Sequence, residues 1–118
     1  MEKEAILQSI AQACDDKQAE NIVALDMQNV SLVADYFLIC HASNQRKVQA
    51  IAKSIQDVLH DHDIQIHHVE GLEQGRWVII DTGIVLCHIF EEEERLFYHL
   101  ERLWGDADII PLQIGETD

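Results

Sequence analysis

The densest group of side chains able to bind a metal ion lies in the segment HDHDIQIHH, residues 60–68. Imidazole and carboxylate groups are common ligands of zinc and other transition metals. The spacing matches no recognised ligand pattern, and His60 and His62, two residues apart near the end of a predicted helix, point in different directions. We therefore expect solvent-exposed histidines rather than a metal site.

Three aspartates at the ends of predicted strands suggest a second kind of chemistry. Asp26, Asp35 and Asp81 could together hold a divalent cation, as phosphoryl-transfer enzymes require. The sequence has no adjacent glycine- and serine-rich phosphate loop and no D-x-D pair on one strand. A metal-dependent nucleotidyltransferase-like enzyme is thus the alternative hypothesis, and a protein without catalytic residues or cofactors is the leading one.

The three cysteines offer little further chemistry. Cys14, Cys40 and Cys87 are widely spaced and form no C-x-x-C motif, so neither a disulfide framework nor a zinc site is indicated. The last two lie in apolar runs, where a small buried hydrophobe is expected. No apolar stretch reaches the roughly 18 residues of a membrane span. We expect a cytoplasmic protein that does not cross a membrane.

The segment ASNQRKVQAIA, residues 42–52, has the general setting of an anion site. Ser43 and Asn44 lie between a predicted strand and the start of a predicted helix, and Arg46 is in the first turn of that helix. Without a glycine-rich loop, a helix cap is the simpler interpretation of these residues.

The charge of the chain restricts its partners. Twenty-two acidic residues oppose eight basic ones, for a formal net charge of -14. Direct binding to nucleic acid depends on lysine and arginine displacing counterions from phosphates, so this balance disfavours it. A basic protein would instead be attracted, although acidity can also serve solubility alone.

The elements that must position these residues follow from hydrophobic periodicity. Apolar residues at helical spacing predict helices over residues 3–17, 45–62 and 91–105. Strands are predicted over residues 21–27, 36–41, 64–70, 76–81 and 84–90. The fold class is α/β, with a mixed five-stranded sheet, parallel at its start and ending in antiparallel hairpins, flanked by helices. We expect one domain over residues 1–107 and a C-terminal tail over residues 108–118.

The stretch RWVIIDTGIVLCHIF, residues 76–90, is predicted to form a β-hairpin with its two-residue turn at 82–83. This turn would place Trp77 opposite His88. Alternation then sorts the side chains onto two faces. One face is small and aliphatic and suits packing under helices: Val78, Ile80, Val85, Cys87 and Ile89. The other is mixed: Trp77, Ile79, Asp81, Ile84, Leu86, His88 and Phe90.

The mixed face has the chemistry of a protein-binding surface, because aromatic anchors supply desolvated area while polar neighbours set orientation. It could equally be covered by another helix or by a second subunit. The residues that we assign to partner binding are Arg76, Trp77, Ile79, Asp81, His88, Phe90 and Tyr98.

Three motifs in this order and spacing resemble the ribosomal silencing factor family, also called the Iojap family. They are ADYFLICHASNQRKVQAIA, VEGLEQGRWVIIDTGIVLCHIF and EEEERLFYHLERLWGDA, and the resemblance spans residues 21–107. The tryptophan of the family's hairpin aligns with Trp77, its D-x-G turn with residues 81–83, and the following histidine with His88. The family's helical tyrosine aligns with Tyr98.

The resemblance implies a homodimeric domain with a nucleotidyltransferase-like fold that lacks the transferase active site. It also implies binding to the large ribosomal subunit through large-subunit ribosomal protein fourteen, on the face where the small subunit docks. Such proteins sterically prevent the two subunits from joining and so repress translation when nutrients are limiting. These implications make a ribosome-binding translation repressor the leading functional hypothesis.

Overall fold

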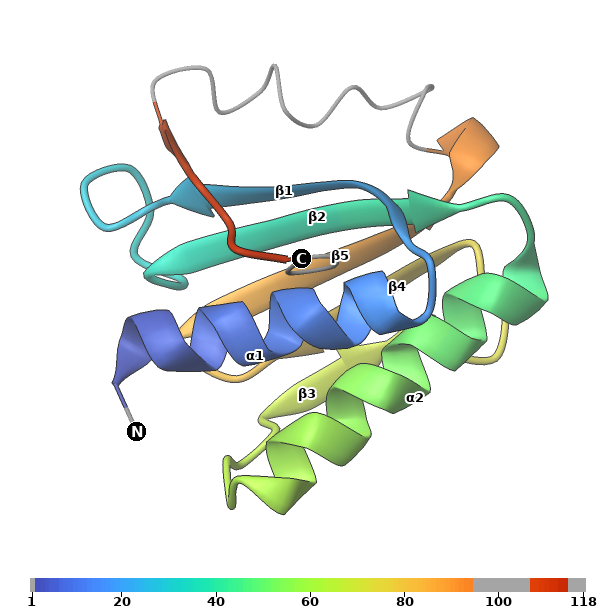
Figure 1. Cartoon of the computed structure of the whole chain (residues 1–118), viewed down its shortest axis with the longest axis horizontal. Helices are drawn as coiled ribbons and strands as arrows, with labels where there is room; N and C mark the ends of the chain where they lie inside the picture. The colour runs from blue at the N-terminus through green and yellow to red at the C-terminus, as the bar shows by residue number, and fades with distance from the viewer. Residues whose placement is uncertain (1, 95–106, 115–118) are drawn as a thin grey trace.

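The computed structural model of the chain describes residues 2–94 and 107–114. These residues form a six-stranded mixed β-sheet and two long α-helices (Figure 1). The strands lie side by side in the order β3-β4-β5-β2-β1-β6. The helices are α1 (Lys3–Asp16) and α2 (Gln45–Asp61), and the strands are β1 (Glu20–Asp26), β2 (Tyr36–Ala42), β3 (His68–Glu70), β4 (Trp77–Asp81), β5 (Val85–Glu91) and β6 (Asp108–Ile110).

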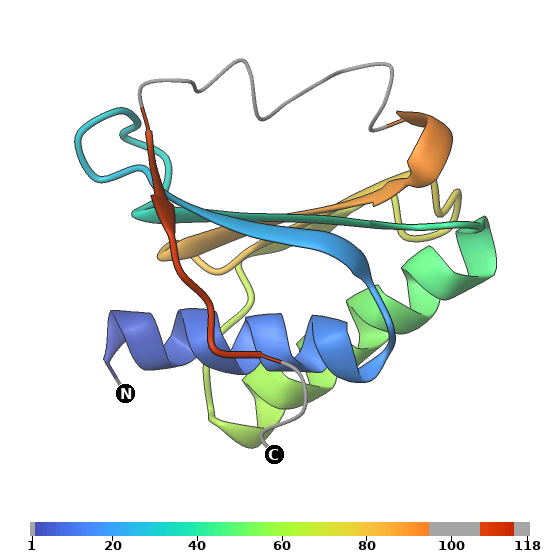
Figure 2. The same cartoon turned by 45° about the horizontal axis from the view of Figure 1, so that its top comes forward.

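Both helices lie on the same face of the sheet (Figure 2). Each has an apolar stripe at helical spacing, and the stripes pack on inward-facing strand residues to form the larger of two hydrophobic clusters. The prediction of a mixed α/β fold with flanking helices is therefore confirmed. Of the third predicted helix, 91–105, the described part shows helix at residues 92–94, and residues 95–105 lie outside the described ranges.

The predicted number of strands was wrong, because the sheet has six. The sixth, β6, pairs antiparallel with β1 and comes from the segment where only a tail was expected. With three residues it is too short to show the alternation that identifies a strand in a sequence.

The parallel start predicted for the sheet concerned the strands before and after α2, 36–41 and 64–70, and the first two strands pair differently. β1 and β2 run antiparallel, joined by residues 27–35 without a helix between them. Parallel neighbours need a crossover of about a dozen residues or more, usually helical, which this connection does not provide. The one parallel pair in the described sheet is β2 with β5.

The crossover through α2 does return the chain in the predicted direction. β5 runs parallel to β2, β4 antiparallel to β5, and β3 antiparallel to β4, so β3 has the direction of β2. It lies at one edge of the sheet rather than beside β2. The strand is shorter than the predicted range 64–70, because its antiparallel ladder with β4 covers residues 68–70.

The hairpin of β4 and β5 is shifted by two residues from its predicted register. Trp77 lies opposite Phe90, and not opposite His88, because the turn is centred on Gly83 and Ile84. When a hairpin turn moves by one residue, the residue opposite each strand position changes by two. Side chains alternate with a period of two, so each one stays on the same face of the sheet. The predicted helix-facing residues are all fully buried: Val78, Ile80, Val85, Cys87 and Ile89.

The second hydrophobic cluster lies on the sheet face opposite the helices. It includes Leu25, Phe37 and Phe90, with Trp77 packed against it. Ile84, predicted on this face, is instead a turn residue that packs with the helix-side core. Among the described residues, no helix has both the length and the apolar character needed to span a bilayer.

Candidate functional site

Three rings from β4 and β5 form an aromatic cluster on the sheet face opposite the helices. Trp77 and Phe90 are cross-strand partners with ring centroids 4.9 Å apart. His88, two residues before Phe90, is the diagonal neighbour of Trp77, and the indole Nε1 donates a hydrogen bond of 3.1 Å to its Nδ1. Phe37 on β2 lies 5.2 Å from the His88 ring. The tryptophan is thus held in one orientation by a hydrogen bond and ring packing.

The hydrogen bond fixes the protonation state of His88. The indole N–H can only donate, so Nδ1 must accept, and the ring is neutral with its proton on Nε2. Burial disfavours the charged imidazolium and lowers the pKa of His88 from 6.5 to about 4. At neutral pH this histidine is an uncharged partner for Trp77.

The residues assigned to partner binding differ in exposure. Arg76 is exposed, and Trp77, Ile79 and Asp81 are half-buried. His88 is 5% exposed and Phe90 is fully buried, so neither presents a surface to a partner. Tyr98 lies outside the described residues. The accessible part of the candidate site is therefore Arg76 with the half-buried β4 residues Trp77, Ile79 and Asp81, a surface that we call the hairpin edge. His88 and Phe90 support it from the neighbouring strand β5.

A tight loop over residues 71–75 sets the position of this edge. Gly71 has a φ of +80° and lies so close to the backbone of Trp77 that a Cβ would approach its carbonyl oxygen to 2.1 Å. The amide of Gln49 on α2 donates to the carbonyl oxygens of Leu72 and Glu73, both at 3.0 Å. The role of Gln49 could not be recognised in the sequence, because its partners lie more than twenty residues away.

The predicted anion or helix-cap residues lie at the start of α2. Asn44 Oδ1 accepts a 2.9 Å hydrogen bond from the backbone N–H of Lys47, so Asn44 is the N-cap of the helix. Ser43 and Arg46 are exposed. A surface depression here is lined by Asn44, Arg46 and also Glu91, whose carboxylate would oppose an anion.

We expect an Asn44→Ala variant to lose about 1 kcal/mol of its free energy of unfolding, because the N–H of Lys47 loses its acceptor. An Asn44→Asp variant keeps a cap and adds favourable charge at the helix N-terminus, so it should retain wild-type stability. Urea unfolding followed by circular dichroism measures both. Equal loss in the two variants would contradict the capping role.

The three aspartates of the alternative enzyme hypothesis are only partly brought together. Asp35 accepts a 3.0 Å hydrogen bond from the Lys3 ammonium, and the charge of Asp26 also acts on Lys3. Asp81 is engaged elsewhere, accepting the N–H of Gly83 at 2.8 Å. Across residues 2–94 and 107–114, no three acidic, histidine or cysteine side chains are grouped to hold a metal.

The other chemistry-bearing residues are dispersed. The four histidines of the segment 60–68 are exposed. The three cysteines are free and buried, and burial raises the pKa of the Cys87 thiol, which makes it a poor nucleophile.

Comparison with known proteins identifies close relatives. The family described as "Ribosomal silencing factor during starvation" matches residues 1–118. The protein called ribosomal silencing factor RsfS from Bacillus subtilis is 50% identical over 115 residues, which cover 98% of each chain. A crystal structure from Bacillus halodurans superimposes with a TM-score of 0.83 at 45% identity, covering 92% of this chain and 99% of the other. One from Chromobacterium violaceum has a TM-score of 0.87 at 29% identity, covering 98% and 95%.

Proposed function

Because the chain belongs to the ribosomal silencing factor family, as its motifs indicated, we propose that it binds the large ribosomal subunit and blocks association with the small subunit. The partner on the large subunit is ribosomal protein fourteen, and the outcome is repression of translation under nutrient limitation. The observation that carries this proposal is the family match over residues 1–118. Homodimerisation, a nucleotidyltransferase-like fold, and action without catalysis or a cofactor are parts of the same proposal.

The charge of the chain supports a ribosomal protein as the partner. Proteins that contact rRNA are usually basic, and a chain with a net charge of -14 attracts them over a Debye length of about 8 Å at physiological salt. Such steering raises the association rate and favours one orientation. The same charge repels the phosphate backbone, so the proposed contact is with protein rather than with rRNA.

The hairpin edge supplies the proposed short-range contact. Trp77 is half-buried and oriented by His88 and Phe90 in the unbound chain. A rigid aromatic side chain loses little conformational entropy on binding, which favours tryptophan at binding hot spots, where arginine is also enriched. Arg76 lies next to it with its guanidinium 4.0 Å from the Glu94 carboxylate. We propose that Arg76, Trp77, Ile79 and Asp81 form the contact.

The direct test is co-sedimentation of the purified protein with isolated large and small ribosomal subunits at low and high salt. We expect selective binding to the large subunit that weakens as salt rises, and a reduced yield of joined subunits when the protein is added first. Binding to neither subunit would contradict the proposal. Equal binding to both would point to non-specific attraction to basic proteins.

The role of Trp77 gives a separate prediction. A Trp77→Ala variant should bind the large subunit about thirtyfold more weakly, equivalent to roughly 2 kcal/mol, because the central anchor is lost. Leu32→Ala is the matched control, since Leu32 is apolar and fully exposed on the connection between β1 and β2. Circular dichroism would establish that both variants are folded before affinities are compared. Unchanged affinity of folded Trp77→Ala would remove this residue from the contact.

A further inference from the structure

The loop over residues 71–75 leads directly into the hairpin edge. Arg76 and Trp77 follow its last residue, Gly75, in the chain. Residues 72–74 are exposed, so the loop buries little apolar surface of its own. A segment of this kind keeps a single conformation only if specific contacts hold it, because fixing its backbone costs conformational entropy.

The two ends of the loop are held by close backbone contacts. Gly71 lies against the carbonyl group of Trp77, and at Gly75 a Cβ would lie 2.9 Å from the carbonyl oxygen of Gln45 at the start of α2. The Gly75 N–H also donates a 3.0 Å hydrogen bond to the carbonyl oxygen of Gly71, which closes the loop. The ends are thus fixed on β4 and on α2, and the residues between them need a further contact.

Gln49 on α2 supplies that contact. The carbonyl oxygens of Leu72 and Glu73 both accept a 3.0 Å hydrogen bond from its Nε2. A side-chain amide has two N–H donors, so one glutamine can satisfy both acceptors. The position of Gln49 is itself well defined, because its α2 neighbours Val48 and Ala52 are fully buried.

The space beside these two bonds is open. A surface depression of about 450 Å³ between α2 and the loop is lined by Gln56, Val69 and residues 71–74. On this side the loop is not packed against the helix. The hydrogen bonds from Gln49 therefore determine how far the middle of the loop lies from α2.

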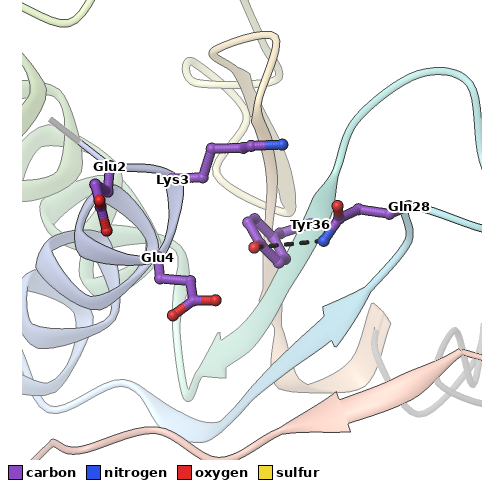
Figure 3. Close-up of a pocket in the computed structure, with 5 residues that line it drawn as sticks. All are labelled: Glu2, Lys3, Glu4, Gln28 and Tyr36. Carbon is purple, nitrogen blue, oxygen red and sulfur yellow. Dashed lines mark hydrogen bonds between the residues drawn. The ribbon is translucent and has the colours of Figure 1, made fainter.

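A larger depression, of about 500 Å³, lies between the start of α1 and the connection that follows β1 (Figure 3). The buried hydroxyl of Tyr36 in it is already hydrogen-bonded to Gln28, at 3.5 Å. Tyr36 aligns with Val85 at the start of β5, whereas Trp77 aligns with Phe90 near the other end of that strand. This depression is thus remote from the hairpin edge, and the loop over residues 71–75 adjoins it.

We propose that Gln49 is a positioning residue for the hairpin edge: it holds the loop over residues 71–75 in one conformation and thereby fixes Arg76 and Trp77 for the partner. This inference rests on the proposed function, in which the hairpin edge binds the large ribosomal subunit. Its physical basis is preorganisation. A loop that is already ordered in the free chain loses less conformational entropy on binding, so affinity is gained without a further contact.

Gln49→Glu removes both hydrogen bonds with almost no change in side-chain size. A carboxylate only accepts hydrogen bonds, so it would face two carbonyl oxygens that have lost their donor. The substitution also makes the chain more acidic, which strengthens its attraction to a basic partner. Weaker binding by this variant would therefore report the position of the loop and not the change in charge.

Gln56→Glu is the matched control. Gln56 lies two turns after Gln49 on α2 and lines the depression beside the same loop. The chemical change and the change in net charge are identical, but the carbonyl oxygens of Leu72 and Glu73 keep their donor.

The first measurement is amide hydrogen exchange of the full-length chain. We expect the Gly75 N–H to exchange about tenfold faster in Gln49→Glu than in the wild type or in Gln56→Glu, while the amides of β2 and β5 are unchanged. Gln49→Lys should restore slow exchange, because its ammonium donates again. Equal exchange of Gly75 in Gln49→Glu and the wild type would overturn the proposal.

The second measurement is affinity for the large ribosomal subunit. Gln49→Glu should bind about fivefold more weakly than the wild type, and Gln56→Glu no more weakly. Because Gln49 acts through Trp77, the losses caused by Gln49→Glu and Trp77→Ala should be less than additive in the double variant. A general loss of stability would not produce this coupling.

Two results would overturn the positioning role alone: additive losses in the double variant, or unchanged affinity of Gln49→Glu with faster exchange of Gly75. A wild type that binds neither subunit would overturn the proposed function, and the positioning role with it. The wild-type measurement therefore distinguishes failure of this inference from failure of the proposed function.

Discussion

A Gly71→Ala variant should lose about 4 kcal/mol of its free energy of unfolding, a large fraction of the roughly 5–15 kcal/mol typical of a single domain. Two effects add. The φ of +80° at Gly71 is a region that alanine adopts only with strain, which costs on the order of 1 kcal/mol. The new methyl group would also lie 2.1 Å from the carbonyl oxygen of Trp77, well inside van der Waals contact.

The clash at Gly71 cannot be relieved by a side-chain movement. The opposing atom belongs to the backbone of β4, whose Trp77 is paired with Phe90 on the neighbouring strand. Accommodating the methyl group therefore requires the loop or β4 to shift, and the Gln49 bonds that hold the loop would shift with it. Overpacking of this kind typically costs about 1–3 kcal/mol or more.

Gly83→Ala is the matched control for backbone strain. Gly83 has a similar φ of +87°, but the three atoms nearest to a Cβ there belong to the ring of His67, an exposed side chain that can move. We expect a loss of about 1 kcal/mol in this variant. Urea unfolding of the two variants beside the wild type gives the comparison. A Gly71→Ala protein no less stable than Gly83→Ala would show that the close approach of Gly71 to Trp77 is absent in solution.

The hairpin shows what alternation in a sequence can and cannot predict. The two faces of β4 and β5 were predicted correctly, because side chains alternate whatever the exact pairing. The pairing itself was wrong by two residues, since the sequence Asp-Thr-Gly-Ile allows a two-residue turn at either of two positions. The side chain of Thr82 decides between them: its Oγ1 accepts the N–H of Val85 at 2.9 Å and closes the turn around Gly83 and Ile84.

The features that the sequence could not reveal depend on contacts between distant segments. β6 is recognised as a strand only through its pairing with β1. The burial of His88 and Phe90 and the bond from Gln49 to the 71–75 loop both join elements that periodicity treats separately. The family resemblance, in contrast, is carried by local motifs, so the order of the amino acids is enough to recognise it.

The stability of the protein should fall by roughly 3 kcal/mol in total as His88 titrates in acid. In the unfolded chain this histidine has its ordinary pKa of 6.5, whereas in the folded protein burial lowers the pKa to about 4. Between these values the unfolded state binds the proton and the folded state does not, so falling pH favours unfolding. The loss begins below about pH 6.5 and is complete near pH 4, and above pH 6.5 this group contributes no pH dependence.

The same proton would disrupt the candidate site. Protonated Nδ1 cannot accept the indole N–H, so Trp77 would lose the bond that orients it. Local rearrangement of the hairpin edge and loss of global stability are thus coupled through one side chain. Binding to the large ribosomal subunit should weaken over the same pH range if Trp77 forms the contact.

His88→Asn separates this effect from other titrations. Asparagine keeps an acceptor near the position of Nδ1 but does not titrate, while the exposed histidines and carboxylates remain as in the wild type. Urea unfolding at about pH 7.5, 6 and 5 should show the wild type losing roughly 2 kcal/mol more than the variant by pH 5. Parallel stability curves for the two proteins would mean that His88 takes up its proton as readily in the folded state as in the unfolded one. The buried, neutral histidine that orients Trp77 would then not exist in solution.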